Sequence, residues 1–127
     1  MKKPLTEKEE TMRKMAVVAS TLAFGVEDYE ILKLKRGNER ICVARMCCYW
    51  MMMRDGEMSS IRVGLCFKRD HASALNGCRK INHILELDHK SGFSGQVKKA
   101  LQYFNAFREK QRENQNKRRI QELENAL

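Results

Sequence analysis

Residues 59–81 read SSIRVGLCFKRDHASALNGCRKI, and this stretch decides the fold that we predict for the chain. Ser59 or Ser60 can cap a short helix that runs to Cys66. The three residues after it form a tight turn, and Asp70 is well placed to cap a second helix. Two short helices joined by such a turn are the helix-turn-helix pattern. The sequence therefore predicts an all-α protein built around a helix-turn-helix.

Apolar residues at helical spacing continue downstream of this stretch. In the helix after Asp70 they recur every three or four positions, so one face is expected to meet the core. That predicted face consists of Leu75, Cys78, Ile81 and Leu85. A break follows at residues 91–95, and a last helix begins near Gln96. The inward face predicted for the last helix consists of Val97, Leu101, Phe104 and Phe107.

Two helices are predicted at the start of the chain. Thr6 and Glu9 have the spacing of a capping box, in which the hydroxyl accepts from the amide of the glutamate while the carboxylate accepts in return. The helix that follows should stop at Gly25, which suits the left-handed position after a helix end. A shorter helix is expected at about 27–34. Its inward-facing residues are expected to be Tyr29 and Leu32.

The segment 39–54 is apolar nearly all round and ends at Asp55-Gly56. Such a helix normally lies at the centre of a protein. Arg45 is a charged residue in this apolar segment, so we expect its side chain to lie at the edge of the buried face. Two interpretations of Arg45 follow: it contacts an anionic partner, or its aliphatic part covers the surface of the core.

After residue 107 the apolar face fades. Residues 108–119 hold six basic and two acidic side chains and no large apolar one, which indicates a solvated helical tail or a disordered arm. We therefore divide the chain into a helix-turn-helix domain at 1–107 and a basic tail at 108–127. Near the end, Ile120, Leu123 and Leu127 are spaced by three and four. They could seed a helix contact with another chain, as an oligomer or with a protein partner.

The chain has 127 residues and a net charge of +9, from 25 Lys and Arg against 16 Asp and Glu. This balance points to an anionic partner. No phosphate-binding loop, dinucleotide fingerprint or zinc-protease motif occurs, so we expect no enzyme activity and no cofactor. The five cysteines lack metal-ligand spacing and are expected to be reduced core residues, with no metal site. The longest apolar run is too short to span a membrane, and we see no signal peptide, so we expect a cytoplasmic protein.

Charged and polar residues gather at the turn and on the first turns of the second helix. In a helix-turn-helix this end enters the major groove of DNA, where unpaired amides and basic side chains attract phosphate. His71 is short enough to approach base edges, and Asn76 lies one turn further on, where it can pair with adenine. The residues predicted to bind double-stranded DNA from this region are Lys68, Arg69, Asp70, His71, Ser73, Asn76 and Lys80.

The same residues resemble a known family. Arg69-Asp70-His71, Ser73, Leu75 and Cys78-Arg79-Lys80-Ile81 are similar to the C-terminal DNA-binding domain of the bacterial replication initiator DnaA. That family reads roughly I-G-x-x-F-G-G-R-D-H-T-T-V-x-H-A-x-x-K-I, and Val63-Gly64-Leu65-Cys66-Phe67 fits its start. Upstream, Arg45 falls where the family carries the Arg of its R-Q-x-A motif. The resemblance covers roughly residues 11–107, and its specific part is 45–81.

The resemblance implies an all-α domain related to the helix-turn-helix of the Trp repressor. It implies that the arginine at position 45 reaches the minor groove, and that Asp70 and His71 contact bases in the major groove. It also implies a role in the control of replication or transcription. The ATPase part of the initiator has no counterpart in this chain.

Two departures from the family pattern support an alternative. The turn is one residue shorter than F-G-G-R, and Ala72 stands where the family has a hydroxyl. The alternative is a protein-interaction module whose helix-turn-helix no longer reads DNA. A further alternative is RNA binding through the basic tail, although residues 108–119 contain no aromatic side chain for stacking on bases.

Overall fold

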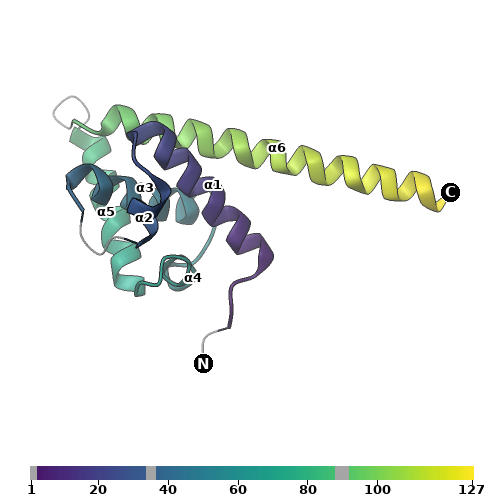
Figure 1. Ribbon diagram of the computed structural model, residues 1–127, viewed down its shortest axis with the longest axis horizontal. Coiled ribbons are helices and arrows are strands. Elements are labelled where there is room, and N and C mark those ends of the chain that lie inside the picture. The colour runs from purple at the N-terminus through teal and green to yellow at the C-terminus, as the bar shows by residue number, and fades with distance from the viewer. Residues whose placement is uncertain (1–2, 34–36, 88–91) are drawn as a thin grey trace.

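The computed structural model describes residues 3–33, 37–87 and 92–127, and within these ranges the chain is all-α (Figure 1). It forms six helices there, with no strand in the described residues. The bounds of the helices are α1 Glu7–Phe24, α2 Asp28–Lys33, α3 Glu39–Arg54, α4 Ser60–Cys66, α5 His71–Leu87 and α6 Ser94–Ala126. The prediction of an all-α protein is confirmed.

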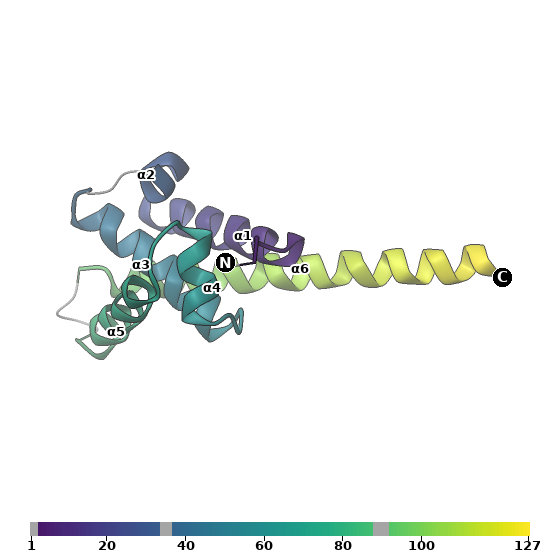
Figure 2. The ribbon, with the colours of Figure 1, turned by 90° about the horizontal axis from the view of Figure 1, so that it is seen from below.

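Helix α3 is the centre of the domain, as its apolar sequence predicts. Five of its side chains have no exposed surface, and α1, α4, α5 and α6 all pack on it (Figure 2). The fully buried five are Ala44, Cys47, Cys48, Met51 and Met52. A helix surrounded in this way needs apolar residues on every side. Asn38 begins α3 by accepting from the amide of Ile41, and Asp55 ends it, so the predicted bounds 39–54 are confirmed.

The start and end of α1 also follow the predicted local chemistry. The Thr6 hydroxyl accepts from the amide of Glu9 at 3.1 Å, and the Glu9 carboxylate accepts from the amide of Thr6 at 2.9 Å. Gly25 then adopts a φ of 67°, a left-handed conformation that glycine reaches without strain, and ends the helix. Both features confirm the capping box and the glycine stop.

The predicted inward face of α2 is wrong. Tyr29 and Leu32 are 53% and 37% exposed, and Ile31 is the residue of α2 that is fully buried. A helix of six residues presents less than two turns to the core, so a single side chain anchors it. Leu34, the last residue of the predicted element, lies outside the described residues.

The buried stripe of α5 differs from the predicted one by about one residue. The predicted Leu75, Cys78 and Leu85 are half-buried, and only Ile81 of the predicted face is fully buried. The stripe on the core side is Ala74, Gly77, Ile81 and Ile84. A Cβ atom at Gly77 would lie 2.7 Å from the Tyr49 ring and 3.1 Å from Met46 Cγ. Small residues therefore face α3 because the two helices approach closely there.

Helix α6 begins in the domain and projects far out of it (Figures 1 and 2). Its 33 residues correspond to about 50 Å of helix at 1.5 Å per residue. Val97, Ala100 and Phe104 fix its first part in the core, and every residue after Gln111 is exposed. The helix continues without interruption across residue 107, so the basic tail is helical and not a disordered arm. No helix among the described residues combines the length and the apolar character needed to cross a membrane.

Candidate nucleic-acid interface

Helices α4 and α5 are joined by a compact four-residue turn at 67–70. The Ser59 hydroxyl accepts from the amide of Arg62 and begins α4. The amide of Arg69 donates to the Gly64 carbonyl at 2.8 Å, which folds the turn back on the end of α4. Lys68 has a φ of 55°, the left-handed conformation that lets the chain reverse. The predicted helix, turn and helix are thus present in this order.

Gly64 fixes how closely the turn packs on α4. A Cβ atom at this position would lie 2.6 Å from the Arg69 carbonyl oxygen and 3.0 Å from the Asp70 carbonyl carbon. Both neighbours are backbone atoms, which cannot move aside as a flexible side chain can. The angle between α4 and α5 therefore depends on glycine at position 64.

Asp70 caps α5, as predicted. Its Oδ1 atom accepts from the Ser73 amide at 2.9 Å and from the Ser73 hydroxyl at 3.0 Å. These two hydrogen bonds lower the pKa of the Asp70 carboxyl group. The carboxylate and the Ser73 hydroxyl are therefore occupied with each other, and neither is presented outward as an isolated group.

The exposed face of α5 carries polar and basic side chains. His71, Asn76 and Lys80 are all exposed and lie outside the buried stripe. Arg79 is exposed as well, and its Nη1 atom donates to Asn76 Oδ1 at 3.2 Å. This hydrogen bond from Arg79 orients the side-chain amide of Asn76. Arg79 was not among the predicted site residues, although its spacing of three from Asn76 already places the two on neighbouring positions of one face.

The two basic residues of the turn have different environments. Lys68 is exposed, whereas Arg69 is half-buried. The positive charge of Arg69 lies close enough to α3 to lower the pKa of two of its side chains, Arg45 and Tyr49. Burial raises the pKa of Tyr49 to about 12, and the positive charge of Arg69 opposes that rise. The Arg69 guanidinium is thus part of the contact between the turn and α3, while Lys68 is the cation at the tip.

The prediction that Arg45 lies at the edge of the buried face is wrong. Its side chain is 5% exposed, and it donates from Nε to the Ile31 carbonyl at 2.7 Å and from Nη2 to the Glu30 carbonyl at 2.9 Å. Burial, followed by the nearby charge of Arg69, lowers the pKa of Arg45. The guanidinium thus donates to two carbonyl groups in the second half of α2. We therefore leave Arg45 out of the candidate interface.

Two arginines outside the predicted set hold α4 in place. Arg62 pairs with Glu9 and also donates to the carbonyls of Lys3 and Pro4, which ties the first described residues to α4. Arg13 donates from α1 to the Cys66 carbonyl at 3.1 Å, at the end of α4. These contacts join residues that are more than 50 positions apart in the chain. The spacing of residues along the sequence therefore does not predict these contacts.

Four of the five cysteines belong to the core or pack against it: Cys47, Cys48 and Cys66 are buried in it, and Cys78 is half-buried beside it. Burial raises the pKa of the Cys48 thiol to about 12 and those of Cys66 and Cys78 to about 11. A thiol with a raised pKa stays protonated at neutral pH and is a poor nucleophile. Among the residues that the structure describes, no three His, Cys, Asp or Glu side chains gather as a metal ion would require.

Comparison with models of protein families, with curated proteins and with solved structures gives no match for this chain. The resemblance to the DnaA domain therefore stays a prediction from the residues at 45–81, and the interface is argued from its own geometry.

Proposed function

We propose that this protein binds double-stranded DNA through α4 and α5, used as a helix-turn-helix of the DnaA and Trp-repressor type. The observation that carries the proposal is the division of α5 into two sides. Its small residues pack on α3, while the first turns present His71, Asn76, Arg79 and Lys80 outward beside Lys68 of the turn. A helix supported along one side and polar along the other can enter the major groove with that polar side.

The charge distribution favours an anionic partner for this side. Three cations lie along it, Lys68, Arg79 and Lys80, and the acidic Asp70 is occupied in capping. Phosphate contacts supply most of the affinity of such interfaces, and contacts to base edges supply the preference for a sequence. His71 and Asn76 are the residues that we assign to base edges. In this proposal the protein acts inside the cell, where it regulates transcription or replication.

Selection from a random pool of duplex DNA, followed by binding measurements at increasing salt, tests the proposal. We expect an enriched sequence and an affinity that falls steeply with salt. His71→Ala should weaken binding to that sequence by about 1–3 kcal/mol without unfolding the domain. His83→Ala is the matched control, because His83 is also exposed on α5 but lies three turns further from the turn. Equal losses in the two variants, or no retained DNA, would contradict the proposal.

A protein-interaction module is the second candidate, and exposed apolar residues favour it. Val18 and Leu22 are 46% and 56% exposed on α1, and three more apolar residues lie exposed at the end of α6. Those three are Ile120, Leu123 and Leu127. If the interface is an apolar protein contact, binding to the partner should change little with salt, in contrast to DNA binding.

A further inference from the structure

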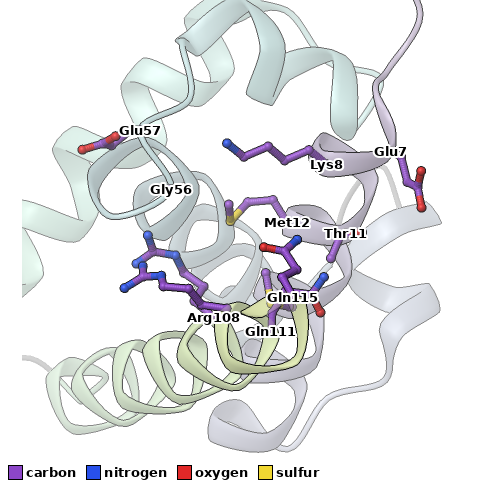
Figure 3. Close-up of a pocket in the computed structure, with 11 residues that line it drawn as sticks. Glu7, Lys8, Thr11, Met12, Gly56, Glu57, Arg108, Gln111 and Gln115 are labelled. Carbon is purple, nitrogen blue, oxygen red and sulfur yellow. The ribbon is translucent and has the colours of Figure 1, made fainter. Parts of the chain in front are cut away.

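A cleft of about 480 Å³ opens where α1 and α6 separate. One wall is the first turns of α1, from Glu7 to Met15, and the other is the middle of α6, from Arg108 to Gln115. The loop after α3, at residues 56 and 57, closes one end (Figure 3). The cleft lies outside α4 and α5, so the proposed DNA-reading helix does not account for it.

Three cations line this cleft from two helices. Lys8 comes from α1, and Arg108 and Arg112 come from α6. The side chains of Lys8 and Arg112 form no hydrogen bond or ion pair with any residue in the part of the chain that the structure describes. Arg108 donates from Nη1 to Asn105 at 3.1 Å and lies over the Phe104 ring, which orients its guanidinium and leaves its other donors available. Two cations are thus unpaired and a third is oriented in one hollow.

The other side chains of the cleft suit an anion as well. Gln111, Gln115 and Thr11 provide neutral donors, and Met12 forms an apolar floor. Two acidic residues also line it, Glu7 and Glu57. Figure 3 shows both of their carboxylates at the outer rim, directed away from the centre, whereas the Lys8 side chain reaches into the space between the helices. The centre of the cleft is therefore cationic although its rim is mixed.

We propose that this cleft binds a phosphate group, held by Lys8, Arg108 and Arg112. Guanidinium groups match phosphate geometry and an ammonium group adds a point charge, which is the donor set found here. The phosphate can belong to a nucleic-acid backbone or to a free nucleotide or phosphate ion. The backbone source rests on the proposed DNA binding, because the phosphates would then be those of the same duplex. Binding of a free nucleotide or phosphate ion would not depend on the proposed DNA binding.

The arrangement along α6 favours the backbone source. Arg112 and Arg119 are seven positions apart, about two helical turns, so both lie on one side of α6. Together with Arg108 they form a line about 16 Å long, given 1.5 Å per residue over eleven positions. A compact ion would need only the cleft, whereas a strand with regularly spaced phosphates can follow the whole line.

The test compares two double variants with the same loss of charge. Lys8→Gln with Arg112→Gln removes the two unpaired cations of the cleft. Lys14→Gln with Arg118→Gln removes one lysine of α1 and one arginine of α6 that do not line it. All four side chains are exposed, so both variants should keep the thermal midpoint of the wild type. Binding is measured to a random-sequence duplex, to inorganic phosphate and to ATP.

If the phosphate comes from a nucleic-acid backbone, the cleft variant should lower the slope of log K against log salt for the duplex by about 1.8, since each phosphate contact adds about 0.9. The control should lower the slope by less than half of that. If the phosphate is free, the cleft variant should weaken phosphate or ATP binding by more than roughly tenfold and leave the duplex slope equal to that of the control.

The two proposals fail separately. Loss of DNA binding in His71→Ala together with equal slopes for both double variants, and no phosphate or ATP binding in the wild type, would overturn the cleft proposal alone. Absence of any DNA binding by the wild type, with phosphate or ATP binding that depends on the cleft cations, would overturn the proposed function and support the cleft.

Discussion

Arg62 and Glu9 form a two-pronged ion pair that joins α4 to the first turn of α1. Arg62 Nη2 lies 2.6 Å from Glu9 Oε1, and Arg62 Nε lies 2.7 Å from Glu9 Oε2. The side chain of Glu9 is only 15% exposed, and the same carboxylate completes the capping box with Thr6. Its hydrogen bonds to Arg62 are the largest of the effects that lower the pKa of Glu9 to about 2. The pair therefore connects the stability of the domain to pH.

The first prediction concerns that pH dependence. A carboxyl group whose pKa is lowered on folding stabilises the protein above its unfolded pKa, and the contribution is lost as the pH falls through the folded value. Glu9→Gln should therefore lower the free energy of unfolding by on the order of 2 kcal/mol at pH 7. The difference from wild type should stay constant above about pH 5, where the unfolded carboxyl group is ionised, and close between about pH 4.5 and 2.

Urea unfolding at a series of pH values measures this difference. Glu124→Gln, on the exposed end of α6, is the control and should unfold like the wild type at every pH. A difference for Glu9→Gln that persists unchanged to pH 2 would show that its carboxylate does not stabilise the fold by its charge.

The second prediction concerns the buried guanidinium of Arg45. Arg45→Ala should lower the free energy of unfolding by about 2–4 kcal/mol, because it leaves a cavity and removes the donor from one buried and one part-buried carbonyl. The carbonyls are those of Glu30 and Ile31. Arg54→Ala is the control on the same helix, and since its side chain is 53% exposed its cost should stay within about 1 kcal/mol. Equal stability of the two variants would place Arg45 outside the core.

The third prediction concerns the close contact at Gly64. Gly64→Ala should destabilise the protein by about 1–3 kcal/mol, because the new methyl group meets the backbone of the turn. Gly95→Ala in α6 is the control, since nothing lies within 4 Å of a Cβ atom there. That change should stabilise the protein by about 0.4–1 kcal/mol. Thermal unfolding shows whether each variant is less or more stable than the wild type. Unchanged stability in Gly64→Ala would show that the turn can move away from α4.

The fourth prediction concerns the exposed part of α6. Deleting residues 112–127 should leave the thermal midpoint within a few degrees of that of the wild type, because none of these side chains is buried. If the basic residues of this segment contact phosphate, the deletion should also flatten the salt dependence of DNA binding without changing the preferred sequence. A change from dimer to monomer at an unchanged salt slope, measured by light scattering, would instead make the segment an oligomerisation element.

Elements with local signals were predictable from the sequence. The bounds of α3 follow from its apolar run and from Asp55-Gly56 after it, and the cap at Asp70 follows from its place before the helix. The inward face of α5 was not predictable, because hydrophobicity selects Leu75 whereas close approach to α3 selects Gly77. The space available at Gly77 depends on the side chains of α3 as well as those of α5, so the sequence of α5 alone does not predict it.

The residues of the candidate sites also differ in whether the sequence could predict them. The polar side of α5 lies on one helix, so its residues could be found by spacing. Arg45 could not be placed, because its partners are backbone carbonyls that have no sequence signature. The cleft cations were equally hidden, since Lys8 and Arg112 are 104 positions apart and meet only when α6 packs on α1.

The packing of α6 on α1 has a consequence for biosynthesis. Met12 and Ala16 of α1 share one core with Val97, Ala100 and Phe104 of α6. On the ribosome, α1 emerges first and must wait for about eighty further residues before its partner helix is synthesised, which takes about 4–16 s at 5–20 residues per second. During that interval the apolar side of α1 is open to chaperones. Folding of this domain is therefore completed only after the first part of α6 has been synthesised, and a chain interrupted before Phe104 lacks the residues that close its core.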